Sequence, residues 1–283
     1  MKIAISAEST IDLSKELLNQ YNIKTLPFTI LLGEDMLLDG EVSSTQIFEY
    51  VQKTKVLPKT SAVNEYQYTE FFASLLNDYD AIVHISLSSG ISTSCSQAIA
   101  AASKMQNVYV IDSKSLSTGI ALLAIYASKL ASKGNISAAE IAKLVSDRVE
   151  KVQASFVIER LDYLYKGGRC SSLQMLGANL LKLRPQIVVK TDTGKMVSGK
   201  KYRGKMDQVV ADYCKDVLEQ FNTPDLSIAF ITYTTATEEM ISAARKALQE
   251  RGFKTIYETT AGATISSHCG EHTLGILYIN DEK

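Results

Sequence analysis

The sequence has no excess of charge of either sign, because 30 basic and 31 acidic residues leave a net charge of −1 over 283 residues. Without an overall field we expect no nucleic-acid partner and at most transient contact with a membrane surface. The four cysteines, at positions 95, 170, 214 and 269, share no close spacing. This disfavours a disulfide framework and a zinc ribbon, and favours free thiols in a reducing cytoplasm.

Long apolar runs are also missing. The longest candidate, residues 118–130, is interrupted by Tyr126, Ser128 and Lys129 and predicts a buried helix rather than a membrane span. Residues 1–6 predict a strand rather than a signal peptide. No Gly-x-Gly-x-x-Gly fingerprint, internal repeat or low-complexity linker occurs. We therefore expect a cytoplasmic protein with no cofactor and no metal.

Strands and helices alternate along the first half of the chain. This pattern predicts an α/β domain, residues 1–152, with a largely parallel sheet and helices on both faces. Ser43 with Gln46, and Ser137 with Glu140, predict capping boxes, and Ser9 with Thr10 predicts a further cap. The expected strands are 2–6, 23–31, 81–86 and 108–112, and the expected helices are 11–20, 44–53, 65–76, 93–105, 118–130 and 138–151.

The second half predicts another α/β domain, residues 153–283, with a mixed sheet and helices. Asp192, Thr193 and Gly194 separate two extended runs and predict a hairpin. The expected strands are 156–158, 185–189, 195–201, 226–232, 253–259 and 273–279, and the expected helices are 161–166, 171–181, 205–221 and 236–251.

A loop of small hydroxyl residues, residues 87–92, follows the apolar strand 81–86 and precedes a helix. Backbone amides at a helix start and serine hydroxyls can together bind an anion. Because the loop has no lysine or arginine, it favours a carboxylate or a neutral polar group over a nucleotide phosphate. The alternative is that Ser92 or Thr93 only caps the helix.

Ligands of parallel sheets bind outside the carboxyl ends of the strands. Thr60, in a predicted polar loop over residues 59–64, and Ser92 can both lie at that edge. The sequence does not place these two residues side by side.

Several motifs in this order resemble the DegV family of bacterial fatty-acid-binding proteins over the whole chain. The matching residues are Glu8-Ser9-Thr10, Thr60-Ser61, Ser88-Ser89-Gly90-Ile91-Ser92, Val110-Ile111-Asp112-Ser113-Lys114-Ser115, Leu164-Tyr165-Lys166-Gly167-Gly168-Arg169-Cys170-Ser171, Arg203 and Ile265-Ser266-Ser267-His268-Cys269-Gly270. The resemblance implies a non-catalytic, monomeric carrier. It would enclose one long-chain fatty acid between two domains and present the carboxylate to a separate ATP-dependent fatty-acid kinase, which makes an acyl-phosphate for phospholipid synthesis.

By the same resemblance, Thr60 and Ser92 would bind the carboxylate with His268 beside it, and Arg169 and Arg203 would serve at the pocket mouth or in kinase docking. The resemblance also makes Ser61, Ser89 and Gly90 a secondary head-group loop. Residues that flank the motifs are candidates for the acyl-chain lining: Ile91, Ile120, Leu123, Ile158, Leu164, Met175, Leu176 and Ile265.

The chain departs from the family pattern at Thr93, at residues 62–64, and at Glu271 and His272, which follow the histidine motif. Glu8 replaces the usual aspartate. Acidic and imidazole groups near a carboxylate would change its hydration and pKa.

Two other functions fit the same residues. Ser89 or Ser92 with His268 would make a Ser-His hydrolase, although no Gly-x-Ser-x-Gly elbow occurs. A sensor would instead bind a polar anion, such as a sugar phosphate, in the same loop. His268, Cys269 and His272 form one short stretch without a second cluster, which disfavours a metal site. His84, inside an apolar strand, is expected to be a hydrogen-bonded core histidine.

Overall fold

A computed structural model describes residues 1–170 and 183–281. The expected helix at 171–181, and with it Met175 and Leu176, lies outside the described residues. Within them, no helix is both long and apolar enough to span a membrane.

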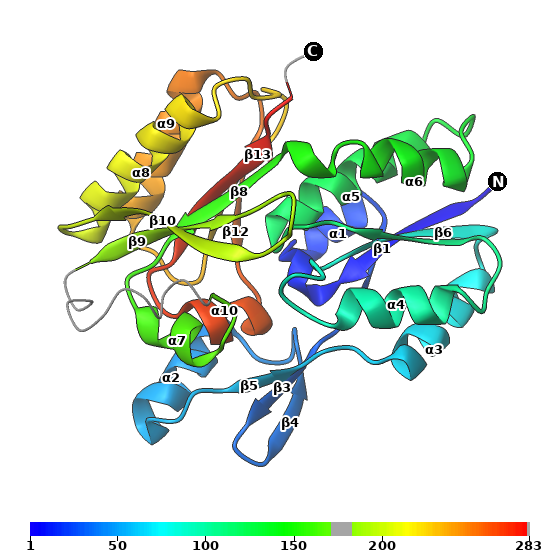
Figure 1. Cartoon of the computed structure of the whole chain (residues 1–283), viewed down its shortest axis with the longest axis horizontal. Coiled ribbons are helices and arrows are strands. Elements are labelled where there is room, and N and C mark those ends of the chain that lie inside the picture. Colours follow the sequence, from blue (N-terminus) through cyan, green and yellow to red (C-terminus); the bar gives the residue numbers. More distant parts are fainter. Residues whose placement is uncertain (171–182, 282–283) are drawn as a thin grey trace.

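The first sheet is parallel and four-stranded, in the order β2-β1-β6-β7. Figure 1 shows α3 and α4 on one side of this sheet and α5 and α6 on the other. The α/β prediction for this half is confirmed. Its strands are β1 (Ile3–Glu8), β2 (Ile23–Leu26), β6 (Ala81–Ser86) and β7 (Val108–Asp112), and its helices are α3 (Glu65–Leu76), α4 (Ser94–Ala102), α5 (Thr118–Ala131) and α6 (Ala138–Ser146).

The second sheet is six-stranded and mixed, in the order β10-β9-β8-β13-β11-β12, and only β11 and β12 pair in parallel. Helices α8 and α9 pack side by side on it (Figure 1). The predicted mixed sheet is confirmed. Its strands are β8 (Val152–Val157), β9 (Arg184–Val189), β10 (Met196–Tyr202), β11 (Ala229–Tyr233), β12 (Ile256–Thr260) and β13 (Leu274–Ile279), and the two helices are α8 (Met206–Gln220) and α9 (Glu238–Arg251).

Helix α5 connects the two sheets physically. It contacts β1 and β6 of the first sheet and β8 and β13 of the second, and most of its residues are buried. A largely apolar helix is what this position requires, because most of it is covered from both sides and only its last turn, with Lys129, reaches the surface. The division at residues 152/153 stays a prediction, although it coincides with the start of β8.

A third, small sheet was not predicted. It contains β4 (Asp35–Leu38), β3 (Thr29–Leu32) and β5 (Lys59–Ser61) in that order. The expected single strand 23–31 is wrong: the chain leaves the first sheet after Leu26, where Pro27 has no N–H to donate, and re-enters another as β3. The expected polar loop at 59–64 begins as β5, because Thr60 pairs with the distant Ile30.

Three helix predictions need correction. Residues 11–20 form a 3₁₀ turn (Ser9–Ile11) and a short α1 (Lys15–Gln20) capped by Ser14, because Asp12 adopts a left-handed conformation that interrupts the helix. The expected helix 138–151 ends at Ser146 and is followed by a 3₁₀ turn (Val149–Lys151). The expected helix 93–105 is shorter in the structure, where α4 spans Ser94–Ala102.

The caps follow the sequence in part. The Ser43–Gln46 capping box at α2 (Ser44–Thr54) is confirmed. At α6, Ser137 accepts the N–H of Glu140, but the reciprocal half of the predicted box is not formed. Helix α7 (Leu161–Lys166) is confirmed.

Helix α10 (Ala263–Cys269) was missed, because its sequence suggests a strand or loop. Threonine, isoleucine and serine are weak helix formers, and the helix is only seven residues long. Tertiary contacts, described below, must stabilise it. Figure 1 places α10 beside α7 and α2, where the second sheet meets the small sheet.

Candidate functional site

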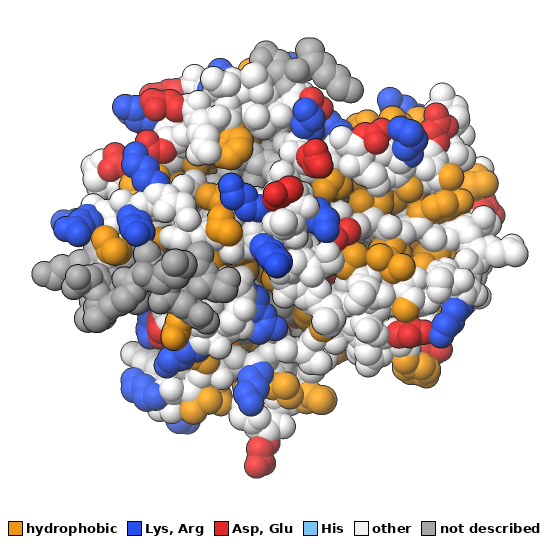
Figure 2. All heavy atoms as spheres, viewed as in Figure 1, with side chains coloured by type: hydrophobic (Ala, Val, Ile, Leu, Met, Phe, Trp, Pro, Cys, Tyr) orange, Lys and Arg blue, Asp and Glu red, His pale blue; other side chains and the backbone are white. Residues whose placement is uncertain are grey.

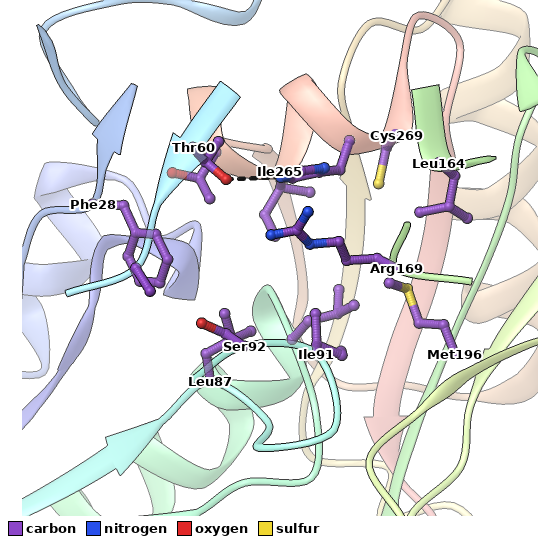
Figure 3. Close-up of a pocket in the computed structure, with 14 residues that line it drawn as sticks. Phe28, Thr60, Leu87, Ile91, Ser92, Leu164, Arg169, Met196, Ile265 and Cys269 are labelled. Carbon is purple, nitrogen blue, oxygen red and sulfur yellow. Dashed lines mark hydrogen bonds between the residues drawn. The ribbon is translucent and has the colours of Figure 1, made fainter. Parts of the chain in front are cut away.

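A pocket opens where the small sheet, the loop after β6, and helices α7 and α10 meet (Figure 3). It contains about 520 Å³ of empty space, counting the part open to solvent. Thr60, Ser92 and His268 all line it, although they are far apart in the sequence. The structure therefore brings together the three residues predicted to bind a carboxylate.

Thr60 and His268 form the polar centre of this pocket. His268 Nε2 lies 2.8 Å from Thr60 Oγ1. When the ring proton is on Nε2, the imidazole donates to Thr60, and the threonine O–H remains free to donate to an anion. Burial, helped by the charge of Arg169, lowers the pKa of His268 to about 4. The imidazole is therefore neutral at neutral pH.

The other ring nitrogen of His268 faces Gly167, the first glycine of the Gly167-Gly168-Arg169 motif. A Cβ added to Gly167 would lie 2.7 Å from His268 Nδ1. Nδ1 is buried without a hydrogen-bond partner among the described residues. Gly167 thus lets the end of α7 approach the imidazole closely and fixes the side on which the ring lies.

Ser92 combines the two roles considered for it. Its Oγ accepts the N–H of Ser94 at 3.2 Å and donates to the Ser94 hydroxyl at 3.1 Å, so it caps the start of α4. Thr93, the other candidate, makes no side-chain cap. Because Ser92 also lines the pocket, its hydroxyl can exchange the Ser94 hydroxyl for a ligand oxygen.

The two predicted arginines lie in different environments. The guanidinium of Arg169 reaches into the middle of the pocket, between Thr60 and Ser92 (Figure 3). Both arginines are exposed, but Arg203 does not line the pocket.

The secondary head-group loop does not line the pocket. Ser61 and Ser89 are exposed, and the Ser89 N–H donates to Asp112. Gly90 packs against the β9–β10 turn, where an added Cβ would lie 2.5 Å from the carbonyl oxygen of Thr193. The glycine serves the contact between the two halves of the chain.

Three predicted acyl-lining residues, Ile91, Leu164 and Ile265, line the pocket. Ile120 and Ile158 are fully buried in the core but line neither this pocket nor the next one. Seven further lining residues were not predicted. Four of them lie in or beside segments that the sequence analysis had singled out: Ala62, Leu87, Thr264 and Cys269. No sequence signal marked the other three: Phe28, Leu116 and Met196.

A second cavity, of about 370 Å³ on the same measure, adjoins the first. Leu116, Ile265 and Cys269 line both cavities and so form their common wall. The rest of the second cavity lies against β8, β11 and β13, with Phe156 and Leu277 in its wall.

Hydroxyl side chains also line the second cavity, but their oxygens are engaged with the protein. Ser117 donates to Asp12, Thr234 to the Gly270 carbonyl, and Thr273 to the Cys269 carbonyl. The Thr232 hydroxyl bonds that of Thr118, and Ser155 bonds Tyr213. These hydroxyls therefore present mainly carbon to the cavity.

Two buried carboxylates hold the start of α10. Asp12 accepts the N–H of Gly262 at 2.8 Å, and Asp39 accepts that of Ala263 at 2.9 Å. Both carboxylates come from the first forty residues, and they satisfy amides that a helix start leaves unpaired. Burial raises the pKa of Asp12 to about 8, with a further contribution from Asp39. This contact explains how a weak helix-forming sequence is kept helical.

Glu8 has a structural explanation. Its buried carboxylate accepts the N–H of Leu87, the first residue of the hydroxyl loop, at 2.8 Å, and the hydroxyls of Tyr68 and Ser86. Burial works against the charged form, but His84 and these bonds hold the Glu8 pKa below its usual value. Glu8 thus anchors the loop that carries Ser92. His84 is a hydrogen-bonded core residue, as predicted.

Glu271 and His272, which depart from the family pattern after the histidine motif, lie near charged residues outside the pocket. Glu271 lies 3.8 Å from Arg160, and His272 lies 3.8 Å from Glu159. Neither lines the head-group pocket, and Thr93 is exposed. The side chains at positions 93, 271 and 272 therefore add no polar group to the pocket.

The structure gives little support to the predicted hydrolase or to a metal site. Ser92 bonds Ser94, Ser89 does not line the pocket, and His268 bonds Thr60, so neither predicted serine pairs with His268. Within residues 1–170 and 183–281, no three His, Cys, Asp or Glu side chains are grouped as metal ligands. Cys95, Cys214 and Cys269 are free thiols, and all four cysteines are buried.

Comparisons with known proteins agree with this arrangement. Residues 2–281 match a family model described as an uncharacterised protein of the DegV family. Protein DegV of Bacillus subtilis is 30% identical, over 98% of this chain and 99% of the relative.

Solved structures extend the likeness to three dimensions. The B. subtilis structure, described as DegV, a fatty acid binding protein, has a TM-score of 0.85 at 27% identity and covers 99% of both chains. A DegV family protein from Thermus thermophilus, described by its fatty acid binding, has a TM-score of 0.89 at 22% identity, over 99% of this chain and 100% of that one. The match along nearly its whole length shows that this chain belongs to the DegV family.

Proposed function

We propose that the protein is a carrier that binds one long-chain fatty acid and presents the carboxylate to a separate ATP-dependent kinase. The observation that carries this proposal is the placement of a hydroxyl–imidazole group, Thr60, Ser92 and His268, in a largely apolar cavity. This cavity shares Leu116, Ile265 and Cys269 with a second apolar cavity. The description of two similar proteins as fatty-acid-binding supports it.

The head-group end supplies hydrogen bonds from hydroxyl groups. Thr60 and Ser92 donate to the carboxylate, and His268 orients Thr60 from behind. Hydrogen bonds to a charged group contribute about 1.5 to 3 kcal/mol each. Arg169 adds a positive charge within the pocket, which favours the ionised form of the acid.

The apolar cavities supply most of the affinity. Each buried methylene contributes about 0.8 kcal/mol before ordering costs, so a chain of roughly 14 methylenes gains on the order of 11 kcal/mol. The tail passes from the first cavity, between Leu116, Ile265 and Cys269, into the second. The head-group residues set the orientation, and the apolar walls determine whether the acid stays bound.

Transfer to a kinase needs a docking surface near the pocket. Arg203 is exposed on the segment that joins β10 to α8, close in sequence to Lys200, Lys201 and Lys205. Several Lys and Arg side chains lie on the face of the molecule that Figure 2 shows. We assign docking to Arg203, and to Arg169 a place at the pocket mouth facing the kinase.

Mass spectrometry of an organic extract of the purified protein tests the carrier role first. A long-chain fatty acid in one-to-one ratio with the protein is expected. A polar anion in its place would favour a sensor, and hydrolysis of short acyl esters would favour the hydrolase.

Two variants separate retention of the lipid from its transfer. Ser92→Ala should lower acyl-phosphate formation with a cognate kinase sharply but lipid retention only in part; unchanged turnover would contradict the assignment of Ser92. Arg203→Glu should abolish turnover and leave the bound lipid in place, and loss of the lipid would argue against docking. Lys143→Glu, an exposed charge reversal on α6, is the matched control.

A further inference from the structure

One buried hydroxyl in the pocket is not used by the protein. Thr264 lines the first cavity and is 4% exposed. Its Oγ1 is buried and has no hydrogen-bond partner within the described residues. Buried hydroxyls in proteins are nearly always bonded, so an unpartnered one that faces a pocket indicates a missing ligand group.

Unlike Thr264, the serines of α10 have hydroxyls that are hydrogen-bonded within the protein. Ser266 bonds the Ser44 hydroxyl at 2.7 Å, and Ser267 donates to the Ala263 carbonyl at 2.7 Å. Thr264 could have bonded back to the preceding turn in the same manner, as threonine in helices often does. Its hydroxyl instead has no partner within the described residues, on a residue that lines the cavity.

The position of Thr264 on α10 places it near the head group. It precedes His268 by four residues, so the two side chains share one face of the helix, about 5 to 6 Å apart at their Cβ atoms. Both line the first cavity, and neither lines the second, whereas Ile265 and Cys269 line both. The free hydroxyl therefore lies with Thr60 and Ser92 and away from the tail.

We propose that Thr264 is a further head-group-binding residue, whose hydroxyl donates a hydrogen bond to the carboxylate of the fatty acid. The inference rests on the proposed carrier function. A carboxylate has two oxygens and about four acceptor sites, so donors from Thr60 and Ser92 leave sites for a third hydroxyl. Three donors from three segments would select an acid over an alcohol of equal length.

The test compares wild type and Thr264→Val, both delipidated, for binding of palmitate and of 1-hexadecanol. Valine keeps the shape of threonine and removes the hydroxyl. Palmitate affinity should fall about tenfold, as expected for one hydrogen bond to a charged group, and hexadecanol affinity should change much less. The melting temperature of the empty protein should not fall, because no protein hydrogen bond is lost.

Thr234→Val is the matched control. The Thr234 hydroxyl lines only the second cavity, donates to the Gly270 carbonyl and accepts the Thr273 N–H. This variant should lower the melting temperature and leave the ratio of palmitate to hexadecanol affinity unchanged. Thr264→Ser, which keeps a hydroxyl, should retain most of the palmitate affinity.

Unchanged palmitate affinity in Thr264→Val would overturn the inference, as would equal losses for palmitate and hexadecanol. Either result would leave the carrier function standing. If wild type bound no palmitate, the proposed function and the inference would both fail.

Discussion

The two ends of the proposed lipid path use the same residue types in opposite ways. At the head-group end, the Thr60 hydroxyl bonds an imidazole, and the Ser92 hydroxyl bonds a neighbouring hydroxyl that a ligand oxygen can replace. The Thr264 hydroxyl has no partner within the described residues. At the tail end, those of Thr234 and Thr273 are fixed to backbone carbonyls.

The difference shows that composition alone does not make a pocket polar. A threonine whose oxygen is bonded inside the protein presents mainly its methyl group to a cavity, and a threonine with a free oxygen presents a donor. The partners, which come from distant segments, decide between the two. The predictions below change one end and leave the other intact.

Blocking the passage between the ends should have the largest effect. Ile265→Trp fills the common wall, so the distal methylenes of a long acid lose their cavity. Exclusion of about four methylenes lowers affinity by roughly 200-fold at about 0.8 kcal/mol each. Displacement of a fluorescent fatty acid, with palmitate and then decanoate, measures the effect.

Decanoate should be affected much less, because its shorter tail reaches less of the second cavity. Ile265→Leu, which conserves volume, is the control, and the melting temperature checks that the tryptophan variant folds. An equal loss for both acids would mean that the tail does not follow this path.

Removing the central hydroxyl should give the next largest effect. Thr60→Val removes the partner of His268 and a donor to the carboxylate. Affinity for palmitate should fall about 10- to 100-fold, in line with one hydrogen bond to a charged group. Binding of 1-hexadecanol provides the internal control, and a comparable loss for the alcohol would place the carboxylate elsewhere.

Displacing His268 without replacing it should lower palmitate affinity several-fold. Gly167→Ala puts a methyl group 2.7 Å from His268 Nδ1, so the ring must turn and the Thr60 bond is strained. Palmitate titration and thermal melting measure the change. Gly168→Ala is the control: its positive φ makes alanine costly by about 1 kcal/mol, but no atom lies within 4 Å of the added Cβ. If both variants bind palmitate equally, Gly167 does not position the imidazole.

A change at Asp12, which holds the start of α10, should alter stability rather than lipid affinity. The pKa of Asp12 is about 8 in the native state against an ordinary value of 3.8. Between these values the native state holds the proton that the unfolded state has lost, so its contribution to stability falls as pH rises from about 4 to 8. Asp12→Asn should remove this part of the slope. Urea unfolding at pH 5 and pH 8 measures it, and an identical pH dependence in both proteins would show that Asp12 is ionised in the native state.

The sequence predicted which polar residues share a pocket better than it predicted which apolar residues do. Thr60, Ser92 and His268 belong to the motifs that resemble the DegV family, and the structure brings them into one pocket. Ile120 and Ile158 have the same apolar character as Ile91 and Ile265, yet only the latter pair lines the pocket. An isoleucine looks the same in sequence whether it faces core or cavity.

The sequence by itself determined the alternation of strands and helices, the two kinds of sheet, and the hydroxyl loop after β6. Periodicity and turn residues are local properties, so they can be found in a short stretch of chain. Only the tertiary structure decided that residues 263–269 form a helix, that β5 pairs with β3, and which hydroxyls remain free. The first two depend on partners more than 25 residues away: Asp12 and Asp39 for α10, Ile30 for Thr60.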